Sequence, residues 1–226
     1  MTRDGRSPIV ALRARGPFAC FTRPELKAER VSYVVPTPSA ARGLIEAVLW
    51  KPAIRWHIER IRVLAPIRSI AFRRNEVNSR AVAPAAKVIA QGGTAPHLYA
   101  DQDRAQRNTI ALRDVDYVIE ARFSFTAKAG ADDNMGKFLD MFRRRVRQGQ
   151  AFQQPYLGCR EFAAEILSPE GAPEPIDDSR DLGLMLWDID FGKVNRPRFF
   201  AARLEAGVLE VPDDPESTLA MLGASA

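Results

Sequence analysis

Residues 37–56 read Thr-Pro-Ser-Ala-Ala-Arg-Gly-Leu-Ile-Glu-Ala-Val-Leu-Trp-Lys-Pro-Ala-Ile-Arg-Trp. This stretch carries the signals that begin and end a helix. Thr37 has a side chain that can cap a helix, and Pro38 suits the first helical position. Trp50-Lys51-Pro52 ends the helix, because the residue before a proline disfavours the α conformation. A helix is therefore predicted from Pro38 to Trp50.

The predicted helix has an apolar face and a polar face. Its apolar residues recur at the i, i+3, i+4, i+7 spacing of a buried stripe, and they are Ala41, Leu44, Ile45 and Val48. Arg42, Glu46 and Leu49 lie on another face. Residues 54–63 then alternate apolar and charged side chains, and the alternation slips after Ile58, which predicts a bulged strand.

Further elements follow from the same periodicities on either side of this stretch. Strands are predicted over residues 9–15, 67–74, 115–125, 162–167, 184–191, 198–204 and 208–211. The run 67–74 is expected to pair with the bulged strand before it. A second helix is predicted over 134–148, with Asn134 as its cap and Gly149 as its stop. Residues 80–98, rich in Ala, Gly and Pro, are expected to be irregular, and the acidic, proline-rich stretch 168–181 is expected to be a linker.

The order of these elements predicts an α+β fold. Strand, helix, strand, strand, helix, strand is the order of a ferredoxin-like (RRM-like) domain. The short strands near the C-terminus predict an appended small antiparallel β-sheet. The expected domains are therefore residues 1–168, with an insertion around 80–108, and a C-terminal antiparallel β region over residues 169–226.

Charge is distributed unevenly along the 226 residues, although the net charge is only +5. Residues 1–160 contain 28 Lys and Arg against 14 Asp and Glu, whereas residues 161–226 contain 5 against 14. Of the 33 basic residues, 27 are Arg, which favours planar contacts with phosphate. A basic body of this kind predicts nucleic-acid binding, with the acidic C-terminal part facing elsewhere.

Two further features limit the class of protein. No apolar segment approaches the roughly 20 residues of a membrane helix, and the first residues lack a hydrophobic signal region, so we expect a cytoplasmic protein without membrane contact. Cys20 and Cys159 are far apart in the sequence, without His or Cys neighbours at metal-ligand spacing. They are expected to be reduced, buried thiols, and no metal or cofactor is predicted.

The segment before the first helix mixes basic and aromatic residues. Arg23, Lys27 and Arg30 are interleaved with three aromatic residues, Phe18, Phe21 and Tyr33. Guanidinium and ammonium groups bind phosphate, and aromatic rings stack on unpaired bases. The segment is therefore expected to contact RNA.

The sequence of the chain closely resembles the fifth family of CRISPR-associated (Cas) proteins, subtype I-C, within the RAMP superfamily. The matching motifs are Phe-Thr-Arg-Pro-Glu (21–25), Pro-Ser-Ala-Ala-Arg-Gly (38–43), Trp-Lys-Pro-Ala-Ile-Arg-Trp (50–56), Arg-Arg-Asn-Glu-Val (73–77), Gln-Arg (106–107), Asp-Tyr-Val-Ile-Glu-Ala (116–121), Met-Phe-Arg-Arg-Arg (141–145) and Leu-Gly-Cys-Arg-Glu-Phe (157–162). They occur in the family's order, and the resemblance covers roughly residues 9–211. Several collinear matches are more specific than any single motif.

This resemblance implies a subunit of the type I-C surveillance complex that binds the repeat-derived 5′ handle of CRISPR RNA and contacts the large and backbone Cas subunits. It also implies metal-independent endoribonuclease activity on the precursor RNA, giving a 2′,3′-cyclic phosphate. Non-specific DNA binding is a further expectation for the basic body. The residues expected to bind RNA are Arg23, Lys27, Arg30, Tyr33, Arg42, Lys51, Arg73, Arg74, Asn75, Arg104, Arg107, Arg143 and Arg144.

The catalytic positions implied by the resemblance are incomplete. The family pattern places Tyr or His before Trp-Lys-Pro and a Lys-His pair at the start of the second helix. Here these positions are Leu49, Lys137 and Phe138, so Lys137 alone keeps an ionisable side chain. Phe138 fits the apolar stripe of its helix. Leu49 shares a face with charged residues, which predicts either an exposed patch at the site or a contact with another subunit.

Other side chains could supply the missing proton transfer. His57 is expected to be a solvated surface residue, and His97 lies in the insertion, where it could act as a substitute base. Tyr33 and Tyr156 are candidate proton donors, although stacking or packing explains each equally well. Two alternatives to a nuclease therefore stay open: a handle-binding subunit without catalysis, and a free-standing RNA-binding regulator. A scaffold without RNA affinity fits the basic body less well.

Overall fold

The computed structural model describes residues 5–26, 28–80, 82–94, 97–191 and 194–223. Within these residues nine strands form one curled sheet, accompanied by helices. The elements are β1 (Val10–Ala19), β2 (Arg30–Val31), α1 (Pro38–Val48), β3 (Ile54–Val63), β4 (Ser69–Val77), α2 (Ala86–Ala90), β5 (Arg104–Phe125), α3 (Met135–Arg147), β6 (Glu165–Leu167), β7 (Arg180–Phe191), β8 (Asn195–Glu205), β9 (Val208–Glu210) and α4 (Glu216–Gly223). No helix in these described ranges combines the length and apolar character needed to cross a bilayer.

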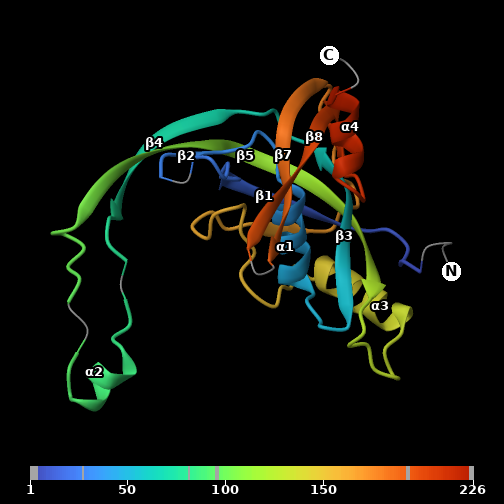
Figure 1. Ribbon diagram of the computed structural model, residues 1–226. Coiled ribbons are helices and arrows are strands. Elements are labelled where there is room, and N and C mark those ends of the chain that lie inside the picture. The colour runs from blue at the N-terminus through green and yellow to red at the C-terminus, as the bar shows by residue number, and fades with distance from the viewer. Residues whose placement is uncertain (1–4, 27, 81, 95–96, 192–193, 224–226) are drawn as a thin grey trace.

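The sheet has the order β6-β1-β5-β3-β9-β8-β7, and β2 and β4 also pair with β5. All of these pairings are antiparallel except β2 with β5. The central strand β5 is 22 residues long. The sheet arches over α1 and α3, and the far ends of β4 and β5 extend into an arm that carries α2 (Figure 1). We use "the arm" for residues 78–103.

The first helix begins where the sequence predicts. The Thr37 hydroxyl accepts a hydrogen bond from the Ala40 N–H at 3.2 Å, and Pro38 occupies the first turn. The helix ends at Val48, two residues earlier than predicted, and Leu49 is its extended C-cap. At the second helix, the Asn134 side chain caps the Lys137 N–H at 2.9 Å, as predicted.

The core lies between the sheet and the helices. Leu44, Ile45 and Val48 of α1 are buried against it, which confirms the predicted apolar stripe. The Trp56 ring lies 5.2 Å from the Phe123 ring and 5.1 Å from the Phe142 ring of α3. These contacts hold α1, α3 and the middle of the sheet together as one hydrophobic cluster.

Of two predictions about the strands, one is confirmed and the other is wrong. The bulge in β3 is confirmed, because its register with β5 shifts between Ile58 and Arg60. The pairing predicted for 67–74 is wrong: β4 pairs with residues 104–112 of β5, from Ser69↔Leu112 to Val77↔Arg104. Residues 104–112 lack a long apolar alternation because much of this ribbon is exposed, so the sequence did not indicate the first half of β5.

The C-terminal strands continue the main sheet instead of forming a separate one. β9 pairs with β3 at Ile61↔Leu209, and β8 and β7 follow outward. The acidic C-terminal part therefore lies against the basic body, contrary to the expectation that it faces elsewhere. Ion pairs across this boundary include Arg6–Asp213 at 2.6 Å and Arg15–Glu165 at 2.6 Å. The terminal helix α4 was not predicted.

Candidate nucleic-acid interface

The residues predicted to bind RNA do not gather at one place. They divide among the junction of α1 and α3, the base of the arm, and a pocket between β3 and β7. Lys27 lies outside the described residues. Each region has a different balance of charge and exposure, so the three are described in turn.

The junction of α1 and α3 contains the three catalytic positions implied by the family pattern. Leu49 is 0% exposed, and its carbonyl oxygen accepts a hydrogen bond from the Trp56 indole N–H at 2.8 Å. The expectation of an exposed Leu49 patch is therefore wrong, because the chain leaves the helical path at this residue and turns its side chain into the core. Phe138 is 2% exposed and packs against Phe123 and Phe125 with ring centroids 6.1 Å away, as its place in the apolar stripe predicts.

Lys137 is the ionisable group at this junction, with its side chain 45% exposed. It has an acidic partner: its Nζ lies 3.0 Å from Asp133 Oδ1. A hydrogen bond from the Gly130 N–H, followed by the bond from Lys137, holds the pKa of Asp133 below its ordinary value, and the charge of Lys51 adds to this effect. The pair therefore consists of a stable carboxylate and an accessible ammonium group.

Exposed basic and aromatic side chains also lie on α3 and directly after α1. Trp50, Lys51, Arg143 and Arg144 are exposed, and neither arginine has an ion-pair partner among the described residues. Arg145 instead donates to the Val48 carbonyl at 2.6 Å and so helps to close the end of α1. Exposed guanidinium and ammonium groups without protein carboxylates can bind phosphate without first breaking an ion pair. This junction is therefore the most open basic region among those predicted.

At the base of the arm, three predicted arginines come together on one face of β4 and β5. Arg30 lies 3.3 Å from Glu76 and 3.1 Å from Glu161, and Arg74 lies 2.8 Å from Glu76 and also contacts Glu161. Arg107 lies 3.8 Å from the Glu76 carboxylate. These five side chains form what we call the arginine–glutamate cluster. Its carboxylates already neutralise much of its positive charge.

The remaining predicted residues at the base of the arm point to the opposite face of the β4–β5 ribbon. Since successive side chains of a strand alternate, Arg73 and Asn75 lie on the other side from Arg74. Arg104 pairs in register with Val77 and shares the face of Asn75. RNA that follows one face of this ribbon can therefore contact either the arginine–glutamate cluster or the side chains of Arg73, Asn75 and Arg104, but not both.

Tyr33 is not available for base stacking in this structure. It is 1% exposed, the Arg23 guanidinium covers its ring at 4.4 Å, and its hydroxyl oxygen accepts a hydrogen bond from the Leu186 N–H at 3.3 Å. Burial raises the pKa of its phenol, which also disfavours a role in proton transfer near neutral pH. The prediction of Tyr33 as an RNA contact is wrong for the isolated chain, because the aromatic residue serves the core beneath Arg23.

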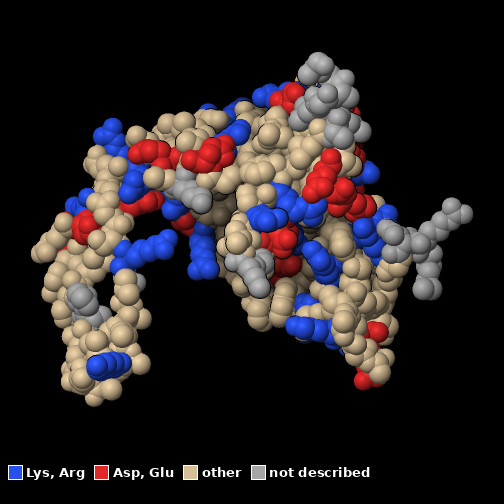
Figure 2. Space-filling model, in the orientation of Figure 1, with Lys and Arg blue, Asp and Glu red and all other residues tan. Residues whose placement is uncertain are grey.

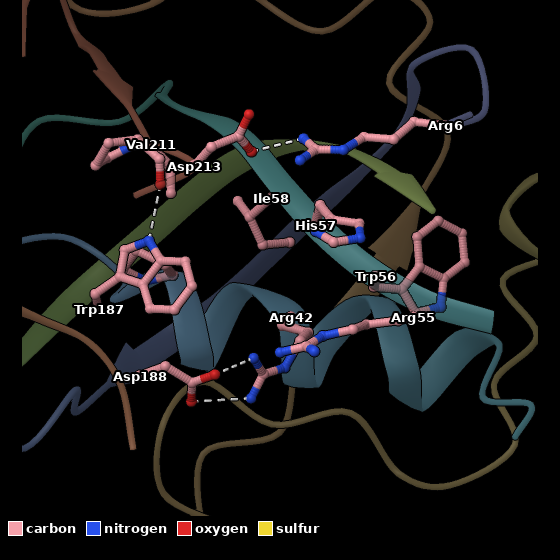
Figure 3. Close-up of a pocket in the computed structure, with 12 residues that line it drawn as sticks. Arg6, Arg42, Arg55, Trp56, His57, Ile58, Trp187, Asp188, Val211 and Asp213 are labelled. Carbon is pink, nitrogen blue, oxygen red and sulfur yellow. Dashed lines mark hydrogen bonds and ion pairs between the residues drawn. The ribbon is translucent and has the colours of Figure 1, made fainter. Parts of the chain in front are cut away.

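The third region is a pocket of about 200 Å³ beside the edge of β3 (Figure 3). Arg42 and Asp188 form an ion pair on one side of it, and Arg6 with Asp213 forms another on the opposite side. The Trp187 indole donates to the Pro212 carbonyl at 3.0 Å. Arg42 was predicted to bind RNA, but its guanidinium is partly buried and already bound to a carboxylate.

Sequence analysis missed Arg55 as a candidate ligand contact. Its exposed side chain lines both this pocket and an adjoining groove formed with Trp187 and Phe191. The available signal was its place in the matched motif of residues 50–56. His57, expected on the solvated surface, is half-buried and its Nε2 lies 2.9 Å from the Ser124 hydroxyl.

Charge at the surface is mixed, not divided into a basic and an acidic half. Figure 2 shows Lys and Arg side chains on both sides of the hollow between the arm and the body, with carboxylates among them. His97 lies in the arm, with its ring 6.1 Å from that of Tyr99, whereas Lys137 is a residue of α3. The arm and α3 lie at opposite sides of the molecule (Figure 1). No imidazole is thus part of the junction of α1 and α3 in the described residues.

Comparison with known proteins shows the family of this chain. The family model described as CRISPR-associated protein (Cas_Cas5), of the Cas5d type, matches residues 9–212. The chain belongs to this Cas5 family. It is 47% identical over 212 residues to the "CRISPR pre-crRNA endoribonuclease Cas5d" of Mannheimia succiniciproducens, covering 90% of this chain and 94% of that protein.

A second relative agrees with this assignment, and a solved structure shares the fold. The protein of the same name from Thermus thermophilus is 41% identical over 216 residues, covering 87% of this chain and 88% of that protein. A crystal structure titled as a CRISPR-associated protein superposes with a TM-score of 0.68 at 20% identity, covering 94% of this chain and 95% of the other. That likeness supports the α+β fold alone.

Proposed function

We propose that this protein binds precursor CRISPR RNA, cleaves it within the repeat and retains the resulting 5′ handle. The observation that carries the proposal is the near full-length identity of 47% to a relative named as a pre-crRNA endoribonuclease. The open basic junction of α1 and α3 supports it, because its exposed cations can bind phosphates; they are Lys51, Lys137, Arg143 and Arg144.

The proposed reaction is attack of a ribose 2′-hydroxyl on the neighbouring phosphorus, with departure of the 5′-oxygen and formation of a 2′,3′-cyclic phosphate. Negative charge develops on the phosphoryl oxygens, and the ammonium group of Lys137 can stabilise it. Asp133 holds that ammonium group in place through its 3.0 Å contact. Since Leu49 and Phe138 cannot transfer protons, the main contribution of the protein is to hold the RNA in line for attack.

The test is incubation of the purified full-length protein with labelled precursor repeat RNA in the presence of a chelator. Discrete cleavage with a 2′,3′-cyclic end is expected, and Lys137→Ala should lower the single-turnover rate by about 10²-fold, the typical loss for one charge-stabilising donor. Lys128→Ala, a change at an exposed lysine on the loop before α3, is the matched control and should retain the rate. Equal rates for all three proteins would contradict the assignment of Lys137.

A second candidate function is handle binding without cleavage. The observation that favours it is that Leu49 and Phe138 are both buried and have no ionisable group. Lys137 is therefore the one ionisable side chain at the three family positions. This candidate predicts tight binding of repeat RNA with no product under the same conditions. A free-standing RNA regulator would instead show no preference for repeat RNA.

Several finer expectations belong to the same proposal. The order β6-β1-β5-β3 supports reading β1, α1, β3, β5, α3 and β6 as a ferredoxin-like unit within residues 1–168, followed by a C-terminal β region over 169–226. The proposed partners are the backbone and large Cas subunits of a type I-C complex in the cytoplasm. Pull-down of the full chain with those subunits tests the partners, and competition with unrelated duplex DNA tests non-specific DNA binding.

A further inference from the structure

Two cysteines that are 139 positions apart meet beside the arginine–glutamate cluster. Cys20 follows β1 and is buried, whereas Cys159 lies on the loop before β6 and is half-buried. The Cys20 N–H donates to the Leu157 carbonyl at 3.0 Å, which fixes the two segments against each other. The sequence analysis expected separate buried thiols, and their contact arises from this packing.

Gly158 permits the close approach. Its φ is +84°, and a Cβ atom at this position would lie 2.1 Å from the Cys20 carbonyl oxygen. Any other residue would push the loop away from Cys20. The neighbouring residue Cys159 is thereby held directly over the end of β1.

The two sulfur atoms share a polar environment. Thr22 Oγ1 lies 3.6 Å from Cys20 Sγ and 3.9 Å from Cys159 Sγ, so one hydroxyl contacts both sulfur atoms. The Cys159 thiol also reaches the Cys20 carbonyl oxygen at 3.5 Å. The Arg30 Nη1 donates to Cys159 Sγ at 3.5 Å.

These contacts make the two thiols unequal. The neighbouring Cys20 thiol lowers the pKa of Cys159, and Thr22 and Arg30 add to this, while burial and the charge of Glu161 oppose it. The neighbouring Cys159 thiol and burial raise the pKa of Cys20. A half-buried thiol with a lowered pKa, next to a buried thiol with a raised one, is the arrangement of a nucleophilic cysteine with a resolving partner.

We propose that Cys20 and Cys159 are a dithiol that hydroperoxides oxidise to an intramolecular disulfide. The Cys159 thiolate attacks the O–O bond of hydrogen peroxide, forming a sulfenic acid and releasing hydroxide. The Cys20 sulfur then attacks the Cys159 sulfur, forms the S–S bond and displaces the hydroxyl as water after its own proton is lost. Two thiols thus supply the two electrons that reduce one peroxide to two waters.

The disulfide would join the end of β1 to the loop beside Arg30 and so close a long covalent loop. Such a cross-link stabilises the folded chain, mainly by restricting the unfolded state. It would also remove the thiolate that Arg30 contacts, leaving its guanidinium to Glu76 and Glu161. This redox chemistry does not depend on the proposed RNA cleavage.

The test treats the full-length protein with hydrogen peroxide and then blocks remaining thiols with an alkylating reagent. We expect two alkylatable thiols to fall to none, with an intact mass lower by two hydrogen atoms and restored by dithiothreitol. The oxidised protein should melt about 5–15 °C higher. Retention of both thiols under peroxide that oxidises a free-thiol control, or a disulfide between two chains, would overturn the proposal.

Two serine variants separate the roles of the sulfurs. In Cys20→Ser, oxidation should stop at a Cys159 sulfenic acid that dimedone traps, whereas wild type should give little adduct. In Cys159→Ser, the buried Cys20 thiol should stay reduced over the same time. Equal dimedone labelling of wild type and Cys20→Ser would show that Cys20 does not resolve the sulfenic acid and would overturn the proposal.

Discussion

Arg42 of α1 and Asp188 of β7 face each other as a two-point ion pair across 146 positions of sequence. The Arg42 Nη2 donates to Asp188 Oδ1 at 3.0 Å, and Nη1 contacts the other carboxylate oxygen. Both side chains are largely buried from solvent. The pair ties the first helix to the C-terminal hairpin, and it explains why an arginine in a matched family motif need not contact RNA directly.

The first prediction concerns the strength of this tie. Arg42→Ala and Asp188→Ala should each lower the free energy of unfolding by about 1–3 kcal/mol. The first leaves the Asp188 carboxylate without its guanidinium partner, and the second leaves Arg42 only its 3.7 Å contact with Glu46. Urea denaturation followed by circular dichroism measures the change. Arg203→Ala is the control: that guanidinium is 68% exposed beside Glu205, and its loss should stay within about 0.5 kcal/mol.

A double-mutant cycle completes this test. If Arg42 and Asp188 interact as the distances indicate, Arg42→Ala/Asp188→Ala should be less destabilised than the sum of the two single variants. Additive losses would mean that the two residues act independently, and the ion pair would then not tie α1 to β7.

Gly158→Ala provides the second prediction. It should lower stability by roughly 2–4 kcal/mol, because the backbone has a positive φ and the new methyl group would meet the Cys20 carbonyl. Gly43→Ala is the opposite control: it lies in α1 with nothing near its Cβ position, and it should raise stability by about 0.5–1 kcal/mol. A Gly158→Ala protein as stable as wild type would show that the loop does not need this close approach.

Local patterns predicted α1 and α3 well, because the signals of these two helices lie within a few residues. The caps at Thr37 and Asn134 and the apolar stripe of α1 depend on side chains one to four positions apart. The bulge of β3 was also visible as a slip in the alternation. The partner of β4 could not be predicted in this way. Its antiparallel pairing with β5 joins residues as far as 43 positions apart, as in Ser69↔Leu112, and leaves no local pattern in the sequence.

The candidate site was predicted less completely, for two physical reasons. A side chain's face cannot be read from helical periodicity at a helix end, so Leu49 was expected outside and lies in the core. A list of basic residues also gives no ion-pair partners, so Arg30, Arg42 and Arg74 were given the same weight as the open Arg143 and Arg144. Composition predicted the charge of the chain, but distant contacts decide how much of it is available.

The third prediction concerns pH and the Asp133–Lys137 pair. The Asp133 pKa is lowered from 3.8, so the carboxylate favours the folded state above that value and loses this effect as pH falls through its lower folded pKa. Carboxyl NMR titration should therefore give a value below 3.8, and Lys137→Ala should move it upward toward 3.8. An unchanged titration in the variant would mean that the Gly130 N–H alone holds the carboxylate.

The last prediction distinguishes open arginines from paired ones through the salt dependence of RNA binding. Each guanidinium that binds a phosphate releases counterions, so Arg143→Ala and Arg144→Ala should each weaken repeat-RNA binding and reduce the slope of log K against log salt by about 0.7. Arg203→Ala, a charge change on the C-terminal hairpin, should leave the slope unaltered.

Arg74→Ala should differ from both kinds of variant, because Arg74 already contacts Glu76 and Glu161. Removing it releases two carboxylates, so affinity should fall without the full loss of slope expected for a phosphate contact. If all four variants changed the slope equally, the response would reflect net charge alone, and the open junction of α1 and α3 would have no special part in binding RNA.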